Sequence, residues 1–239
     1  MKKCCLITGA SRGIGKAVAI ELAQKHGLHI LINYASNTAA AQETLEQITS
    51  NGCSAELLPF RVEDFAETEQ VIASWFKNNA DCKIEVLVNN AGITKDNLMV
   101  FMESEDFNAV VDINLKGAYN TTKAVLNHMV RNRYGRIINI VSVSGQKGTP
   151  GQVNYSAAKG GLIGATKALG QEMAKRKITV NAIAPGFINT EMMKTVPKEY
   201  LDNLLSKTPL HRLGEVEDIA NAYAFLCSDE ASYITGTTL

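Results

Sequence analysis

The chain has 239 residues, 24 basic and 24 acidic side chains, and hydrophobic residues at 46% of its positions. This length and composition suit one large buried core, so we expect a single globular domain over residues 1–239 and not a disordered chain. Zero formal net charge excludes the basic surface typical of a nucleic-acid-binding protein. No apolar run approaches the roughly 18–20 residues that cross a bilayer, and no signal-peptide cleavage site follows Met1, so we expect a cytoplasmic protein without membrane contact.

The cysteines and histidines give no sign of a disulfide framework or a metal site. No two cysteines have C-x-x-C spacing, and the four histidines are dispersed. We therefore expect no metal and interpret the cysteines as small hydrophobic side chains. They are Cys4, Cys5, Cys53, Cys82 and Cys227.

Short apolar segments alternate along the chain with longer amphipathic ones. The apolar segments are Cys4–Ile7, Leu28–Asn33, Ala55–Phe60, Ile84–Val88, Arg136–Val141 and Thr179–Ala184. The amphipathic segments are Gly13–Lys25, Thr38–Asn51, Glu67–Asn78, Ser104–Arg131, Val153–Lys175 and Glu215–Leu226. Short apolar runs suit strands buried on both faces, and each parallel crossover needs a covering helix. We predict an α/β fold: one doubly wound Rossmann domain, with a parallel sheet and helices on both faces.

Residues 187–212 separate the last predicted strand from the last predicted helix. They contain Met192, Met193, Pro197 and Pro209. Insertions at the carboxyl edge of such a sheet commonly cover the ligand crevice, so we predict a substrate lid here. The alternative is a surface helix pair without a gating role.

A glycine-rich turn joins the first predicted strand to the first predicted helix. It reads Thr8-Gly9-Ala10-Ser11-Arg12-Gly13-Ile14-Gly15. Glycines at such a turn let the backbone approach a pyrophosphate, which accepts hydrogen bonds from the free N–H groups of the helix. Although a glycine triplet alone is weak evidence, its place between strand and helix favours a dinucleotide site over an incidental turn. The predicted contacts are Gly9, Ser11, Arg12, Gly13, Ile14 and Gly15.

The G-x-x-x-G-x-G spacing resembles the short-chain dehydrogenase/reductase family, and further motifs of that family follow in order. They are Asn89-Asn90-Ala91-Gly92, Asn114-Leu115, Ser142, Tyr155-x-x-x-Lys159 and Pro185-Gly186. The resemblance covers essentially the whole chain. It implies cofactor contacts at Asn90, Ala91, Gly92, Tyr155, Lys159, Pro185, Gly186 and Ile188.

The spacing of Tyr155 and Lys159 places both on one face of a helix. A tyrosine with its ordinary pKa of about 10 is a poor acid or base near neutrality. We expect the nearby Lys159 cation, helped by the positive nicotinamide when the cofactor is oxidised, to stabilise the phenolate and lower that pKa. Tyr155 could then exchange a proton with a carbonyl oxygen. Ser142 would donate a second hydrogen bond to the same oxygen. The resemblance implies that Lys159 also holds the nicotinamide ribose and that Asn114 positions a relay water.

The end of the second predicted strand indicates the cofactor. It reads Ile32-Asn33-Tyr34-Ala35-Ser36-Asn37 and contains no acid. An acid there binds the ribose of NAD, whereas its absence with an arginine nearby accommodates the 2′-phosphate of NADP. We predict NADP(H), held by Arg12 and Ser36. Alternatively, Arg12 is a solvated loop residue.

The resemblance places the adenine pocket at Arg61-Val62. The Val62 N–H would bind the adenine edge. Family members often have Asp or Asn where this chain has Arg61, so Arg61 either stacks on the adenine or points to solvent.

Within the family, longer stretches resemble the 3-oxoacyl-[acyl carrier protein] reductases of fatty-acid synthesis. These stretches are Asn90–Leu98, Gly135–Ile140, Gly151–Tyr155 and Ala184–Thr190. Acetoacetyl-CoA and polyketide reductases share much of this pattern and remain alternatives. A non-catalytic dinucleotide-binding redox sensor is the alternative from another class, although the intact Asn114, Ser142, Tyr155 and Lys159 argue against it.

The resemblance also implies partners. Arg133 and Arg176 match positions where such reductases dock an acidic carrier protein; alternatively, they are favourable charges at helix C-termini. Family reductases are usually homotetramers, built through the helices Ser104–Arg131 and Val153–Lys175 and a C-terminal strand. The chain stops at Tyr233–Leu239, so we expect either that its natural C-terminus lies further on or that it lacks this seventh strand.

Overall fold

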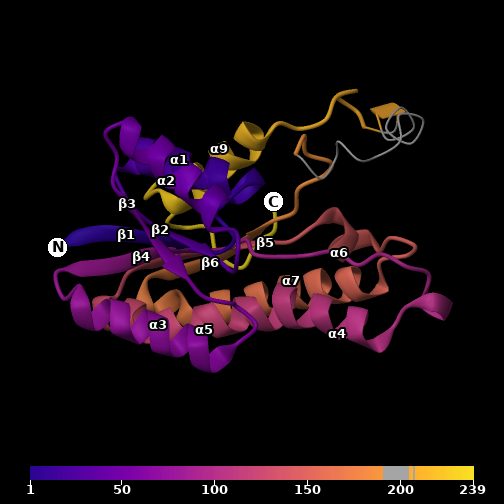
Figure 1. Ribbon diagram of the computed structural model, residues 1–239, viewed down its shortest axis with the longest axis horizontal. Helices are drawn as coiled ribbons and strands as arrows, with labels where there is room; N and C mark the ends of the chain where they lie inside the picture. The colour runs from indigo at the N-terminus through magenta and orange to yellow at the C-terminus, as the bar shows by residue number, and fades with distance from the viewer. Residues whose placement is uncertain (191–204, 207) are drawn as a thin grey trace.

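The computed structural model of the protein describes residues 1–190, 205, 206 and 208–239. A parallel six-stranded sheet forms its centre (Figure 1). The strands are β1 (Lys2–Ile7), β2 (His29–Tyr34), β3 (Ala55–Pro59), β4 (Cys82–Asn89), β5 (Gly135–Ile140) and β6 (Ile178–Ile183). Their order is β3-β2-β1-β4-β5-β6, so the direction of winding reverses between β1 and β4. The predicted doubly wound α/β fold is confirmed.

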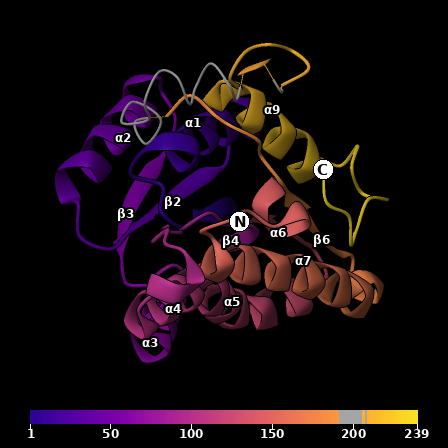
Figure 2. The ribbon, with the colours of Figure 1, turned by 90° about the vertical axis from the view of Figure 1, so that its right-hand side faces the viewer.

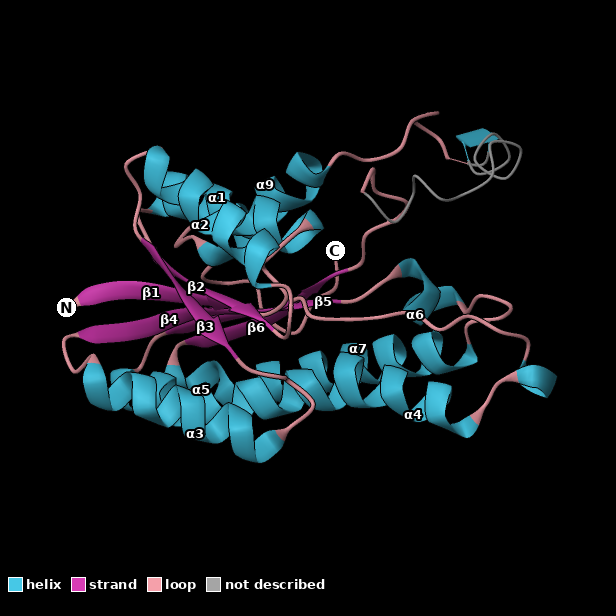
Figure 3. Ribbon diagram, in the orientation of Figure 1, coloured by secondary structure: helices cyan, strands magenta, loops and turns pink. Residues whose placement is uncertain are grey.

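Helices cover both faces of this sheet (Figures 1 and 3). One face carries α1 (Gly13–His26), α2 (Thr38–Ser50) and α9 (Val216–Cys227). The other carries α3 (Phe65–Asn78), α4 (Ser104–Val111), α5 (Gly117–Asn132) and α7 (Val153–Met173). The end-on view of Figure 2 shows the two helical layers with the strands between them. Every central strand is therefore shielded from water on both sides.

Alternation along β1 explains how the two faces of the sheet are filled. Cys5 and Ile7 pack in the core beneath α1 and α9, whereas Cys4 and Leu6 pack in the core beneath α3 and α5. This period of two is a property of the strand backbone. All of β2, β5 and β6 is buried, which accounts for the continuous apolar runs in the sequence. Cys4, Cys5 and Cys227 are buried free thiols that pack as hydrophobic side chains.

The predicted uniform helix Ser104–Arg131 is wrong in its middle. The chain forms α4, then a π-helical turn η2 (Asp112–Lys116), then α5. The side chain of Asn114 explains this, because its Nδ2 donates both to the Val110 carbonyl (2.8 Å) and to the Ile93 carbonyl outside the helix (2.9 Å). π-turns of this kind are frequent at functional sites.

Two short elements have no counterpart in the sequence prediction: the 3₁₀ turn η1 (Met99–Phe101) and the helix α6 (Val143–Lys147). A further 3₁₀ turn, η3 (Ala174–Arg176), forms the end of the predicted helix Val153–Lys175. Ser142 caps α6, accepting a hydrogen bond from the Ser144 N–H at 3.1 Å.

The predicted lid, residues 187–212, falls largely on residues 191–204 and 207, which lie outside the described part of the chain. The start of this segment is joined to the residue just beyond its end, because Gly214 N–H donates to the Phe187 carbonyl (3.0 Å) and Asn189 N–H to the Gly214 carbonyl (2.8 Å). The C-terminal residues lie beside β6: Ala182 N–H donates to the Thr237 carbonyl, and Leu239 N–H donates to the Ala182 carbonyl. Among the described helices, none has the length and apolar character that a membrane span requires.

Candidate active site

The glycine-rich turn lies at the carboxyl ends of β1 and β4, where the strand order reverses and such sheets bind ligands. Gly9 and Gly13 have φ of +62° and +56°, a region that favours glycine. A Cβ at Gly15 would lie 2.5 Å from the Gly9 carbonyl oxygen and from Asn90 Nδ2. The turn is therefore compact only because these positions lack side chains.

Three polar side chains from neighbouring strands hold this turn. Asn90 Nδ2 donates to the Thr8 and Gly9 carbonyls (2.9 and 3.0 Å). Thr8 Oγ1 accepts from the N–H groups of Asn90 and Ala91 (2.9 and 3.0 Å). Asn33 accepts from Gly9 N–H (3.3 Å) and donates to the Leu58 and Phe60 carbonyls. Asn33 and Thr8 were not singled out from the sequence, although a lone amide in an apolar strand was a usable signal.

The start of α1 fits a dinucleotide phosphate. Its N-cap residue Arg12 makes no side-chain cap, and its first turn contains no acid, so the first N–H groups and the positive end of the helix dipole are free for an anion. Gly92 lies across from this turn, where a Cβ would overlap the Asn114 side-chain oxygen. Arg12 and Ser36 are both exposed. The residues present thus fit the predicted cofactor.

The other predicted cofactor contacts lie around this edge. Pro185 and Gly186 follow β6, with the Pro185 carbonyl near Val143 N–H at 3.5 Å, and Ile188 is buried. Val62 is buried, and its carbonyl accepts from Asn120 (2.8 Å). Arg61 forms ion pairs with Asp64, the N-cap residue of α3, and with Glu67 in its first turn, both at 3.3 Å. In the protein without cofactor Arg61 is therefore held by acidic partners, and both its stacking on the adenine and its pointing to solvent stay predictions.

Ser142 and Tyr155 come together where α6 packs against α7. A Cβ at Gly145 would lie 2.8 Å from the Lys159 backbone, so this close packing requires glycine there. Burial raises the pKa of Tyr155, while a hydrogen bond with the Ser142 side chain lowers it and the charge of Asp96 raises it. Tyr155 is consequently held in its proton-bearing form. In the protein without cofactor Lys159 is not among the groups that change this pKa, so the expected lowering by the Lys159 cation together with the oxidised nicotinamide stays a prediction.

The buried position of Lys159 explains why its amine does not lower the pKa of Tyr155. Its side chain is 2% exposed, and its Nζ donates to the Ile140 carbonyl at the end of β5 (2.8 Å). Burial lowers the pKa of Lys159 to about 7. Its Nζ lies 5.6 Å from the centre of the Tyr155 ring. Lys159 can therefore gain and lose a proton near neutrality, next to the phenol.

Asn114 completes the predicted set. Its Oδ1 is buried and accepts no hydrogen bond from the described residues. A Cβ at Gly92 would meet both this oxygen and, at 3.6 Å, Lys159 Nζ, so the two groups border the same space. A buried acceptor without a partner is unfavourable unless water or a ligand reaches it. The arrangement suits a water molecule between Asn114 and Lys159.

A buried polar network that the sequence analysis did not predict lies behind these residues. Asn89 Nδ2 on β4 donates to Asn139 Oδ1 on β5 (2.8 Å), and Asn139 Nδ2 donates to Thr166 Oγ1 on α7 (2.9 Å). Thr121 on α5 donates to Asn89 Oδ1 (2.6 Å). The network ties both long helices to the sheet below the predicted catalytic residues. Its signal in the sequence was two asparagines within otherwise apolar strands.

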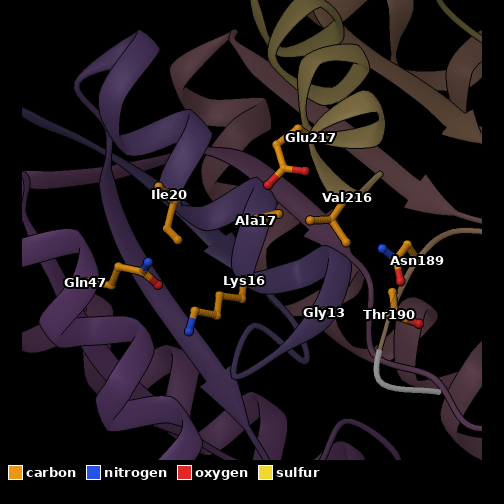
Figure 4. A pocket seen from close by; sticks show the side chains of 9 residues that line it. All are labelled: Gly13, Lys16, Ala17, Ile20, Gln47, Asn189, Thr190, Val216 and Glu217. Carbon is orange, nitrogen blue, oxygen red and sulfur yellow. The ribbon is translucent and has the colours of Figure 1, made fainter. Parts of the chain in front are cut away.

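A separate cavity of about 450 Å³ lies between the first turn of α1, α2 and the start of α9 (Figure 4). Lys16, Gln47 and Glu217 line it, together with Thr190. It includes Gly13 of the glycine turn but none of Ser142, Tyr155 and Lys159. The cavity therefore adjoins the phosphate end of the site and is not the place of reaction.

The two predicted docking arginines are brought together at the far end of α7. Arg133 follows α5 with φ of 52°, and its Nη2 donates to the Lys175 carbonyl (3.3 Å), next to Arg176. Arg131, Lys175 and Lys177 are exposed at the same end, as are both arginines. By the helical rise, this basic end lies about 30 Å along α7 from Tyr155.

Comparison with known proteins assigns the chain to a family. Residues 9–239 match a family profile described as enoyl-(acyl carrier protein) reductase. The chain belongs to the short-chain dehydrogenase/reductase family. It is 44% identical over all of its 239 residues to the 3-oxoacyl-[acyl-carrier-protein] reductase FabG of Staphylococcus epidermidis, covering 97% of that protein.

Two further relatives carry the same activity in their names. The 3-oxoacyl-[acyl-carrier-protein] reductase of a Synechocystis species is 47% identical over 98% of this chain and 92% of its own length. FabG of Haemophilus influenzae is 45% identical over 99% of this chain and 95% of its own length. Membership of this family implies a nicotinamide cofactor.

The buried amine predicts a specific effect of pH on stability. Between pH 7 and 10.5 the unfolded state binds more protons than the folded state, because Lys159 is charged only when unfolded, so the free energy of unfolding rises with pH. Lys159→Met removes this dependence. In the protein without cofactor, this substitution should raise the free energy of unfolding by about 2 kcal/mol more at pH 7 than at pH 9. Urea unfolding at the two pH values measures the difference.

Lys167→Met, at an exposed position of the same helix, is the matched control and should give equal changes at both pH values. Equal changes for Lys159→Met as well would show that burial does not neutralise this amine.

Proposed function

We propose that the protein reduces the 3-oxo group of an acyl thioester carried on acyl carrier protein to the 3-hydroxy group, as a step of fatty-acid biosynthesis. The observation that carries the proposal is the grouping of Ser142 and Tyr155 beside the buried Lys159, in a chain 44–47% identical to proteins named for this reaction.

The mechanism assigns each residue a separate task. A bound nicotinamide supplies the hydride that adds to C3 of the substrate. The hydroxyl groups of Ser142 and Tyr155 donate hydrogen bonds to the C3 oxygen, where negative charge develops. Tyr155 transfers its proton to that oxygen, which gives the 3-hydroxyacyl product. Lys159 and the water at Asn114 then return a proton to the phenolate.

The family description names enoyl reduction, so the two reactions must be told apart. In enoyl reduction the hydride also adds to C3, but the charge develops on the thioester oxygen and the proton goes to C2. In carbonyl reduction the oxygen that carries the charge also takes the proton, so a tyrosine beside that oxygen can do both tasks. The relatives named for 3-oxoacyl reduction support this assignment.

Tyr155→Phe tests the mechanism. It should lower kcat for an acetoacetyl thioester by about 10²- to 10⁴-fold, the usual contribution of a general acid, while cofactor affinity changes little. The measurements are the steady-state rate of NADPH oxidation and cofactor titration by fluorescence.

Tyr233→Phe, at a fully exposed tyrosine, serves as the control and should retain the wild-type rate. Faster turnover of the 2-enoyl thioester of the same length would establish enoyl reduction instead. Cofactor binding without turnover of any thioester or ketone would favour the redox sensor, and equal rates with the CoA thioester would remove the preference for the carrier protein.

NADPH is the cofactor that the end of β2 supports. No acid stands there to repel a 2′-phosphate, and Arg12 and Ser36 are exposed nearby. Arg12→Glu should raise the KM for NADPH about tenfold or more, which corresponds to at least ~1.4 kcal/mol, and leave the KM for NADH within about twofold. An equal rise of the KM for NADPH and for NADH would mean that Arg12 does not bind the 2′-phosphate.

The basic end of α5 and α7 is the proposed docking site for the acidic carrier. Because it lies about 30 Å from Tyr155 of the same chain, we propose that it serves the active site of a neighbouring copy within the expected homotetramer. Arg133→Glu with Arg176→Glu should raise the KM for the carrier-linked substrate about tenfold and spare a small thioester. Lys25→Glu on the opposite face is the control; unchanged carrier kinetics in the double variant would contradict docking here.

A further inference from the structure

Asn154 is the second residue of helix α7 and lies directly before Tyr155. Its side chain is completely buried. Asparagine is a poor helix former, and burying its amide without hydrogen bonds costs free energy. Asparagine at this position is therefore favourable only if both ends of the amide have partners.

Both ends of this amide have a backbone partner. Asn154 Nδ2 donates to the carbonyl of Lys95 in the loop after β4 (2.9 Å), and Oδ1 accepts from the N–H of Tyr155 (2.7 Å). The first N–H groups of a helix have no partner within the helix, and an N-cap side chain often accepts from them. The N-cap side chain of Gln152 makes no such bond and donates instead to Asp96 in the same loop (2.7 Å). Asn154 therefore replaces the cap for Tyr155.

A second buried amide holds the same loop from its other side. Asn114 Nδ2, in the π-helical turn, donates to the Ile93 carbonyl (2.9 Å), two residues before Lys95. The Lys95 ammonium also pairs with Asp106 on α4 (2.6 Å), and α4 packs against α7 (Figure 1). Residues 93–95 are thus a short link between the π-helical turn and the start of α7.

We propose that Asn154 is a positioning residue for the general acid. Its amide joins Tyr155 to residues 93–95, and Asn114 joins the same residues to the proposed proton relay. The two amides together fix the separation of the proton donor and the group that returns its proton, and such sites must be held to within about 0.5 Å. The effect on turnover rests on the proposed function, whereas the effect on the loop is a property of the protein without substrate.

Asn181 on β6 provides a matched comparison. It is 1% exposed, its Nδ2 donates to the Ile234 carbonyl (2.8 Å), and its Oδ1 accepts from the Thr237 N–H (3.2 Å). These are the same two kinds of bond that Asn154 makes, but they hold residues near the C-terminus and not the loop after β4. Asn181→Leu is therefore the control for the loss of a buried amide as such.

Amide hydrogen exchange, followed by mass spectrometry in the protein without cofactor, tests these bonds directly. Asn154→Leu removes both of them, so the Tyr155 N–H loses its acceptor and the loop loses one attachment to α7. The Asn97 N–H, which donates to the Gly151 carbonyl (2.9 Å), reports on that attachment. Exchange should become about fivefold faster or more in peptides that contain Asn97 and in those that contain Tyr155.

The control variant should change exchange elsewhere. Asn181→Leu should speed exchange at Thr237 and leave peptides that contain Asn97 at the wild-type rate. Wild-type exchange at Asn97 in Asn154→Leu, or equally fast exchange there in both variants, would overturn the proposal.

Turnover separates positioning from a purely structural role, which would lower the fraction of folded protein and not the rate of the folded molecule. With an acetoacetyl thioester, Asn154→Leu should lower kcat per folded enzyme about 10- to 100-fold, since a misplacement of about 1 Å can cost 10²-fold. The KM for NADPH should stay within about twofold, because both bonds of Asn154 lie outside the glycine turn. Asn181→Leu should retain the wild-type kcat, and an equal fall in both variants would contradict positioning.

Asn154→Asp keeps the acceptor for the Tyr155 N–H and makes the bond to Lys95 depend on pH. Burial raises the pKa of a carboxyl group, and only its protonated form has an O–H to donate. Relative to wild type, kcat should therefore be nearly restored at about pH 6 and low at about pH 9, whereas the deficit of Asn154→Leu should be equal at both. Exchange at Asn97 should follow the same order.

If Asn154→Leu does not fold, Asn154→Asp decides, and a ratio to wild type that is independent of pH contradicts the proposal. The exchange measurements need no turnover. A protein in which exchange changes as expected but which reduces no 3-oxoacyl thioester would refute the proposed function and support the link between Asn154 and the loop.

Discussion

The burial of the Lys159 amine at the carboxyl edge of the sheet is the constraint on which the rest of the site depends. The amine is removed from water and hydrogen bonds to the last carbonyl of β5. An ammonium in such a place loses most of its hydration, so the neutral form becomes accessible near pH 7. Tyr155, buried beside it, keeps its proton for the same reason. Proton donor and proton relay are thus both set by exclusion of water.

Polar side chains within the sheet make this geometry rigid. Asn33, Thr8 and Asn90 hold the glycine turn, and Asn89 and Asn139 bind the long helices to β4 and β5. A buried amide that satisfies several backbone groups has few alternative arrangements, since each unmade hydrogen bond is costly in the interior. The apolar residues account for the compact core, whereas these amides specify where the loops at its edge lie.

Much of the fold could be predicted because its signals are local. The apolar runs became β1 to β6 with ends shifted by one or two residues, since a strand covered on both faces needs nothing but apolar residues of strand length. Three other features could not be predicted in this way: the π-turn at Asn114, the helix α6 and the hydrogen bond between Gln152 and Asp96. Each depends on a hydrogen bond or close packing with residues distant in sequence: Ile93 for Asn114, Lys159 for Gly145, and Gln152 for Asp96.

The sequence by itself determined the strand and helix pattern, the glycine turn and the identities of Asn114, Ser142, Tyr155 and Lys159, because spacing along the chain carries that information. Only the tertiary structure decided the state of these groups. In the protein without cofactor, burial raises the pKa of Tyr155 and lowers that of Lys159, and burial is a property of the packed molecule. Likewise, the glycines of the turn fit because strands far apart in sequence place Asn90 against Gly15. Ionisation and close approach are set by neighbours in space, which spacing in the chain does not specify.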